Sequence, residues 1–252
     1  MKIANVEIGP DQPCRFVAEL SNNHNGDRDR CGRLIDAAQA AGADVVKFQC
    51  YSPDELVALR GDGPAPEPWG SQGWSMRDLY AKARTPFDWF PKIRDHCERV
   101  GMPWFSSVFG EESLAVLQSV GCPAYKIARL DNQSDPLANL LLAADGIPPI
   151  LTSADWGEPF TCADLLLYCP PGYPALTVDL PDRFGDDQHF QGFSYHQTDP
   201  ALALEAARRG AQLIEMHLML ADEPSALESQ VSLTEHQFAE MVAVVRAREL
   251  LG

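Results

Sequence analysis

The chain has 252 residues, of which 45% are hydrophobic and 22% charged, as expected for a globular protein with a substantial core. Its 36 acidic and 20 basic residues give a net charge of -16 at pH 7. Such a surface repels the phosphates of nucleic acids and of anionic lipids, so neither is expected as a partner. An anionic substrate would need cations gathered at one place in the structure.

The seven cysteines show neither a CxxC pair nor a regular spacing. This pattern indicates reduced thiols and not a disulfide framework. The N-terminal residues are too polar for a signal peptide, and no stretch has the length and apolarity of a membrane-spanning helix. We therefore expect a cytoplasmic protein.

Short apolar runs alternate with amphipathic stretches along the chain. The strand candidates are 16–20, 45–50, 103–109, 124–128, 149–153, 165–169, 192–196 and 213–218. The helix candidates are 29–41, 86–100, 111–120, 136–144, 201–209 and 234–250. This alternation favours an α/β fold in which a parallel sheet closes into a (β/α)8 (TIM) barrel, as a single domain over residues 1–252. An open, doubly wound sheet is the main alternative, but no glycine-rich dinucleotide fingerprint follows any strand.

Three connections depart from an ideal barrel. Residues 154–164 are near the minimum for a parallel crossover, and residues 172–191 contain Pro174, Pro181 and Gly185. We therefore expect the fifth and sixth helices of the ring to be shortened or missing. Residues 52–85 are rich in Pro, Gly and Trp and too long for an ordinary connection, so they predict a functional lid or a disordered loop.

Charged residues stand at the carboxyl ends of the strand candidates, where the active sites of TIM barrels are built. Glu19 ends the first run, and a carboxylate within a buried strand is rare unless it is paired. Lys47 and Gln49 share one face of the second strand, and Lys126 repeats the arrangement on a later strand. One inward lysine can be a structural ion pair, whereas two on separate strands indicate a site for phosphate and carboxylate.

Hydroxyl groups also occur at strand ends and could donate hydrogen bonds to phosphate oxygens, although each is a weak signal alone. These residues are Ser106, Ser107, Thr152 and Ser153. By contrast, His24, Asn25 and Gly26 are typical of a turn and not of catalysis.

Two histidines mark the last two strand candidates. His196 closes one strand and His217 lies near the end of the next, so the imidazoles become neighbours if the strands are adjacent. A single strand histidine is more often a satisfied polar residue than a ligand. Two histidines, completed by carboxylate and water ligands, suit Mn²⁺, Zn²⁺ or a similar divalent ion. Glu215 points to the same side as His217, which makes it a candidate pocket residue.

Five motifs follow one another from about Val17 to the C-terminus. They are A-E with N-H-N-G in 18–26, G-A-D-V-V-K-F-Q in 42–49, G-C-P-A-Y-K-I-A in 121–128, S-Y-H in 194–196 and I-E-M-H in 214–217. In order and spacing they resemble the catalytic barrel of the N-acetylneuraminate (sialic acid) synthase family. The resemblance covers nearly the whole chain.

The resemblance implies condensation of phosphoenolpyruvate with the aldehyde of an amino sugar, with Mn²⁺, Zn²⁺, Mg²⁺ or Co²⁺ bound by His196 and His217. The implied phosphoenolpyruvate contacts are Lys47, Ser107, Lys126, Ser153 and Ser194. The residues that match positions near the reacting centre or the sugar are Glu19, Gln49, Tyr173 and Glu228. A homodimer is one assembly that the resemblance allows.

The chain departs from the family pattern at the substrate positions. Arg129 stands where the family has a phosphate-binding serine, so it either clamps phosphate or excludes it. Asp131 replaces a catalytic glutamate, Tyr195 replaces the acid of an S-D-H triplet, and Glu228 replaces an aspartate. Either Glu19 or Asp131 is expected to handle the proton when water adds.

The printed chain also ends at Gly252, before the antifreeze-like C-terminal domain that the family carries, which leaves the acceptor open. An aldol or lyase reaction on another small acid, and a non-catalytic binding subunit, remain as alternatives.

Overall fold

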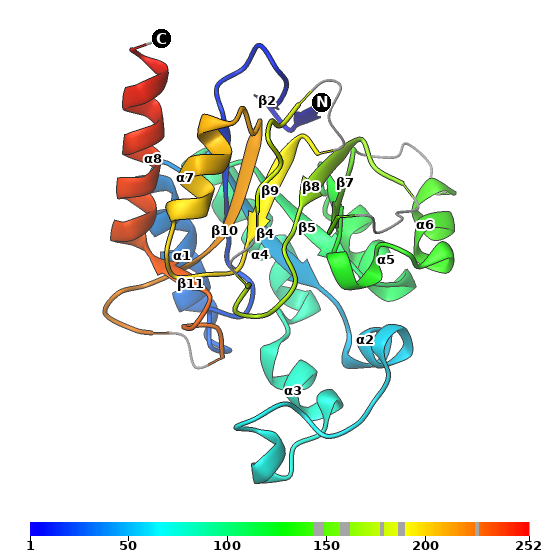
Figure 1. Ribbon diagram of the computed structural model, residues 1–252. Coiled ribbons are helices and arrows are strands. Elements are labelled where there is room, and N and C mark those ends of the chain that lie inside the picture. The colour runs from blue at the N-terminus through cyan, green and yellow to red at the C-terminus, as the bar shows by residue number, and fades with distance from the viewer. Residues whose placement is uncertain (144–148, 157–161, 177–178, 186–189, 225–226, 252) are drawn as a thin grey trace.

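The computed structural model describes residues 1–143, 149–156, 162–176, 179–185, 190–224 and 227–251. Eight parallel strands form a closed barrel, because β10 pairs with β9 on one side and with β3 on the other (Figure 1). The strands in barrel order are β3 (Arg15–Glu19), β4 (Val45–Cys50), β5 (Trp104–Val108), β6 (Tyr125–Ile127), β7 (Ile150–Ala154), β8 (Leu165–Tyr168), β9 (Gly192–Tyr195) and β10 (Leu213–Met219). The predicted (β/α)8 barrel is therefore confirmed, with all eight strands close to their expected bounds.

Helices cover the outside of this barrel, with bounds near the predicted ones. They are α1 (Arg28–Ala40), α4 (Phe90–Val100), α5 (Glu111–Ser119), α6 (Asp135–Leu142), α7 (Ala201–Arg208) and α8 (Glu235–Glu249). Among the described residues that connect β7 to β8 and β8 to β9, none is helical, in agreement with the expected loss of the fifth and sixth helices. No helix in the described ranges is both long and apolar enough to cross a membrane.

Smaller elements complete the fold. Strands β1 (Lys2–Ile3) and β2 (Val6–Glu7) form an antiparallel pair, and β11 (Ser232–Thr234) pairs with the carboxyl end of β10. Side chains on the outer face of the barrel pack against the helices, for example Phe16 edge-on to Phe238 of α8. The core is thus a layer between the sheet and the helices, whereas the inner face of the strands also holds charged groups.

The segment 52–85 is a helical insert, which corrects the expectation of a disordered loop. It contains α2 (Pro53–Arg60), the short helix η1 (Gly70–Gln72) and α3 (Met76–Ala83). Capping boxes at Ser52 and Ser75 begin the two α-helices, satisfying backbone N–H groups that would otherwise lack partners. The helices share a small core made of Tyr51, Leu56, Tyr80 and Phe109. The insert extends beyond the barrel beside the carboxyl end of β4 (Figure 1).

The N-H-N-G motif forms the turn between β3 and α1. The backbone N–H of Gly26 donates to Nδ1 of His24 (3.0 Å), while Nε2 lies 3.2 Å from the hydroxyl of Thr85. This pattern requires a neutral ring with the proton on Nε2. Burial lowers the pKa of His24 to about 4, which agrees with the neutral form. His24 therefore holds the turn against Thr85 and the ring of Trp89.

The buried neutral state of His24 predicts a stability that falls with acidification. In the unfolded chain a histidine takes up a proton near pH 6.5, whereas in the folded protein it resists until about pH 4. Protonation therefore favours the unfolded state, and the free energy of unfolding should fall by about 2 kcal/mol from this group between pH 7.5 and pH 5. Urea titrations should show a smaller fall in His24→Gln. An equal fall in both proteins would contradict this account.

Candidate active site

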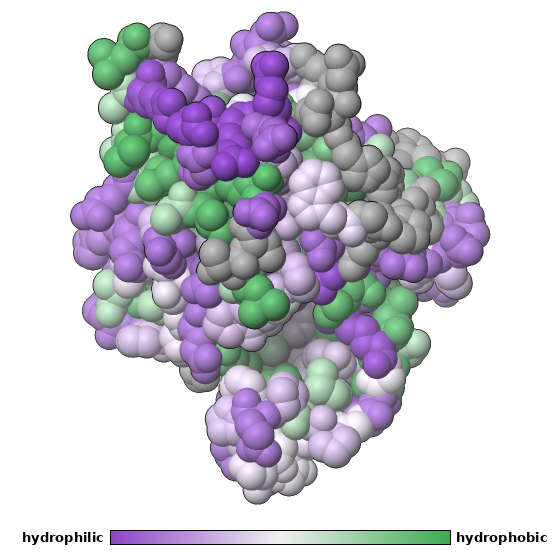
Figure 2. All heavy atoms as spheres, viewed as in Figure 1, coloured by the Kyte–Doolittle hydropathy of each residue, from purple (hydrophilic) through white to green (hydrophobic). Residues whose placement is uncertain are grey.

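A cavity of about 630 Å³ lies at the carboxyl ends of the barrel strands. Figure 2 shows the surface hollowed between the body of the barrel and the lobe that carries α3. The strand ends supply a polar floor that includes Lys47, Lys126, Ser194 and Glu215. The insert supplies a wall that is largely apolar and includes Tyr51, Leu56, Trp69, Leu79 and Tyr80. The cavity thus joins two chemically different surfaces.

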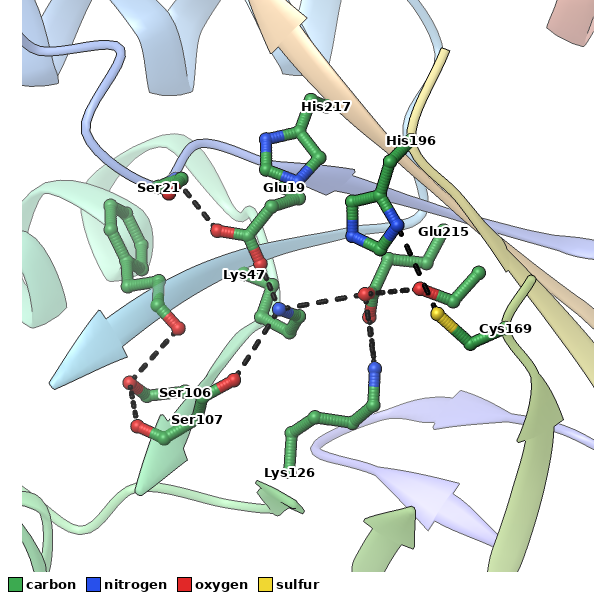
Figure 3. Close-up of polar contacts among 12 residues, drawn as sticks. Glu19, Ser21, Lys47, Ser106, Ser107, Lys126, Cys169, His196, Glu215 and His217 are labelled. Carbon is green, nitrogen blue, oxygen red and sulfur yellow. Dashed lines mark hydrogen bonds and ion pairs between the residues drawn. The ribbon is translucent and has the colours of Figure 1, made fainter. Parts of the chain in front are cut away.

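Glu215 lies at the centre of the floor and links two lysines (Figure 3). The ammonium of Lys126 lies 3.0 and 2.9 Å from its two carboxylate oxygens, and that of Lys47 lies 3.5 Å from Oε1. The hydroxyl of Ser194 also donates to Oε1, at 2.9 Å. Burial alone would raise the pKa of Glu215, but Lys126 and Lys47 lower it well below its usual range. Glu215 is therefore a permanent anion between two cations.

Glu19 provides the second carboxylate of this network. It forms an ion pair with Lys47 and accepts a hydrogen bond from the backbone N–H of Ser21 (2.7 Å). Burial alone would lower the pKa of Lys47, but Glu19 and Glu215 raise it above its usual value. Lys47 also donates to the hydroxyl of Ser107 (3.4 Å). Two buried carboxylates thus balance two buried ammonium groups.

The hydroxyl of Ser153, on the floor, is a buried group without a partner among the described residues. Ser153 lines the cavity together with Ser107 and Ser194. A buried polar group without a partner is costly, so this hydroxyl is suited to an oxygen of a bound molecule.

The predicted histidine pair is assembled, with ring centroids 5.2 Å apart. Burial lowers the pKa of His196 to about 3, and the neighbouring His217 adds to this effect, so its ring is neutral and can act as a ligand. Nδ1 of His217 lies 3.4 Å from the carboxylate of Glu228, an arrangement that orients an imidazole toward a metal through its other nitrogen. In the described part of the chain, no three His, Cys, Asp or Glu side chains converge on one point.

Tyr173 joins Glu228 to this pair. The Tyr173 hydroxyl donates to Glu228, which also accepts from the hydroxyl of Ser21 (3.0 Å). The Tyr173 ring centroid is 5.1 Å from that of His196 and 5.9 Å from that of His217. Burial would raise the pKa of Glu228, but His217 and the two hydroxyl donors lower it to about 2. Glu228 is therefore ionised and fixed at the edge of the histidine pair.

Asp131 lies in a different position from the other expected site residues. Its carboxylate is buried and accepts from Nε (3.0 Å) and Nη2 (2.6 Å) of Arg60, and Asp131 does not line the cavity. Arg60 and Arg129 do line it. Of the residues singled out from the sequence, those that do not line the cavity are Glu19, Ser106, Asp131, Thr152 and Tyr195. Those that line it are Lys47, Gln49, Ser107, Lys126, Arg129, Ser153, Tyr173, Ser194, His196, Glu215, His217 and Glu228.

Sequence reasoning missed Arg60 and the aromatic wall, because they belong to the insert and not to a strand end. A charged residue at the end of a short exposed helix is ordinary in any sequence, so no local signal set Arg60 apart. The aromatic residues of segment 52–85 were visible, but nothing in the sequence showed which way they face.

Comparison with known proteins adds an independent line of support. The model of the NeuB family matches residues 34–154 and 165–252 of this chain. Pseudaminic acid synthase of Campylobacter jejuni subsp. jejuni is 30% identical, over 99% of this chain and 77% of that protein. Human N-acetylneuraminate-9-phosphate synthase is 26% identical, over 96% of this chain and 72% of that protein.

Solved structures agree on the fold. An N-acetylneuraminic acid synthetase from Leptospira borgpetersenii superposes with a TM-score of 0.78 at 23% identity, covering 100% of this chain and 90% of that one. The spore coat polysaccharide biosynthesis protein spsE of Bacillus subtilis gives a TM-score of 0.70 at 27% identity, covering 99% and 72%. With the family model matching both halves of the barrel, the chain belongs to the NeuB family.

Proposed function

We propose that this protein condenses phosphoenolpyruvate with the aldehyde of an amino sugar, releasing phosphate and a 2-keto-3-deoxy acid. C3 of phosphoenolpyruvate forms a bond to the aldehyde carbon, the aldehyde oxygen takes a proton, water adds at C2, and the bond from C2 to the phosphate oxygen breaks. The observation that carries the proposal is the pair of buried lysines that share one cavity with a pair of histidines. Family membership and relatives named as synthases support it.

The floor of the cavity suits the phosphate and carboxylate of phosphoenolpyruvate. Lys47 and Lys126 offer the positive charge that the acidic surface of the protein lacks. Ser107, Ser153 and Ser194 add hydroxyl donors, with that of Ser153 still without a partner among the described residues. Arg129 also lines the cavity, which favours a clamp on phosphate over a role that excludes it.

His196 and His217 are suited to hold a divalent ion such as Mn²⁺, Zn²⁺, Mg²⁺ or Co²⁺, with oxygen atoms of water or substrate completing its coordination. The neutral ring of His196 and the contact between Glu228 and His217 fit this role. A bound ion would supply Lewis-acid polarisation of the aldehyde carbonyl.

Proton transfer at C2 is assigned to Glu19. Glu19 is the better suited of the two expected acids, because it pairs with Lys47, which lines the cavity. Burial also raises the pKa of its carboxyl, although Lys47 opposes the effect. Asp131 is less suited, because its partner Arg60 comes from the insert and not from the floor. Gln49, Tyr173 and Glu228 line the remaining part of the cavity, where they would orient the acceptor.

Wild-type protein should release phosphate from phosphoenolpyruvate when a divalent metal and an N-acetylhexosamine are present. Lys126→Met should lower kcat/KM for phosphoenolpyruvate by about 100-fold, because a charge-assisted contact worth up to about 3 kcal/mol is lost. Lys92→Met, at an exposed position on α4, is the matched control and should behave as wild type. A phosphoenolpyruvate KM unchanged in Lys126→Met would contradict the proposed site.

Removal of one imidazole should weaken metal binding. His217→Ala should bind Mn²⁺ at least about tenfold more weakly by titration calorimetry, because one of two protein ligands is gone. His236→Ala removes a histidine that is 80% exposed on α8 and should leave the affinity unchanged. Wild-type affinity in His217→Ala would rule out the histidine pair as the metal site.

A further inference from the structure

Arg60 is a charged residue that lines the cavity from the insert and not from a strand end. It ends α2 of the insert, and its guanidinium lies 5.4 Å from the ring centroid of Phe109. Its side chain is 24% exposed, whereas that of its partner Asp131 is 1% exposed. The pair therefore presents the guanidinium to the cavity and keeps the carboxylate behind it.

Asp131 holds Arg60 through two parallel hydrogen bonds, at 3.0 and 2.6 Å. A bidentate pair fixes the plane of the guanidinium and uses two of its five N–H groups. The Arg60 guanidinium also interacts with the hydroxyl of Tyr80 in α3. Burial alone would lower the pKa of Arg60, but its contacts with Asp131 raise it, so the guanidinium stays charged and oriented. Its other N–H groups can donate to a bound molecule.

The surroundings of Arg60 indicate which substrate it would meet. Arg60 belongs to the insert, which lines the cavity with Leu56, Trp69 and Tyr80. The lysines that suit phosphoenolpyruvate belong to the floor, on strands β4 and β6. Arg60 is therefore placed toward the acceptor.

We propose that Arg60, positioned by Asp131, contacts the acceptor and donates hydrogen bonds to hydroxyl or carbonyl oxygens of an uncharged sugar. This inference rests on the proposed function. Asp131 cancels the charge of Arg60, while Glu67 and Glu228 add negative charge to the cavity lining. With Arg129 assigned to the phosphate of phosphoenolpyruvate, no unbalanced cation in the described part of this wall is left for an acceptor phosphate, whereas neutral oxygens still accept from a fixed guanidinium. The rings of Trp69 and Tyr80 can cover the apolar faces of a sugar.

Binding of the acceptor tests this without turnover. In titration calorimetry of the wild type with metal present and phosphoenolpyruvate omitted, so that no turnover occurs, N-acetylhexosamines should bind at least about tenfold more tightly than their 6-phosphates. Arg60→Gln should weaken binding of the neutral sugar about tenfold or more, and leave the affinity for phosphoenolpyruvate within about twofold. Tighter binding of the phosphorylated sugar, or no binding of either, would overturn the inference.

A double-mutant cycle separates positioning from catalysis. If Asp131 acts only through Arg60, Asp131→Asn should raise the acceptor KM about as much as Arg60→Gln, and the double variant should be no worse than either. Each single variant leaves one charged partner unpaired, which could destabilise the fold, whereas the double variant leaves none. Thermal unfolding of all three variants shows whether any loss of activity comes from misfolding. A kcat loss of about 100-fold or more in Asp131→Asn, with Arg60→Gln active, would instead make Asp131 a catalytic residue.

Arg77→Gln is the matched control, because Arg77 pairs with Asp54 and Asp62 on the exposed side of the same insert. It should change neither the acceptor KM nor the phosphoenolpyruvate KM. If the wild type is active and Arg60→Gln has the same acceptor KM, the role of Arg60 is refuted and the proposed function stands. A wild type that releases no phosphate with any aldehyde would refute the proposed function.

Discussion

The other features at the mouth of the barrel depend on the ion network around Glu215. Burying an isolated ammonium or carboxylate is expensive, and here two lysines and two carboxylates share one desolvated space. Glu215 pairs with both Lys47 and Lys126 and holds their ammonium groups on the floor of the cavity. An anionic substrate would therefore enter by taking over partners that already exist, and the protein need not hold bare cations.

Parallel register brings these groups together. His217 lies beside Glu19 across β10 and β3, and Glu19 lies beside Lys47 across β3 and β4. One layer further along the strands, Gln49, Ser107 and the neighbouring Lys126 line up across β4, β5 and β6. Since side chains alternate along each strand, residues at matched register point to the same side. The site is thus two stacked rows of side chains, from strands that are distant in sequence.

The insert adds a wall of different origin. Its helices are held by their own caps and by a small aromatic core that they share with Tyr51 and Phe109 at the ends of barrel strands. The floor consists of strand-end residues, whereas Arg60 comes from the insert and is held by Asp131. Chemistry at the strand ends and selection of the acceptor would then be separable properties of this chain.

Much of this protein was determined by local sequence. Apolar runs of period two predict the strands. A lysine or histidine within such a run must point toward the barrel mouth, because on the outer face it would be buried under the helices without a partner. Lys47, Lys126, His196 and His217 were identifiable for that reason.

Only the tertiary structure decided which side chains pair with one another in the site. Nothing in the sequence places Glu215 between two lysines, or turns Asp131 toward Arg60, which comes from a segment expected to be an irregular lid or loop. The physical reason is that alternation along a strand is a property of a few neighbouring residues, whereas the choice of a partner depends on how distant segments pack.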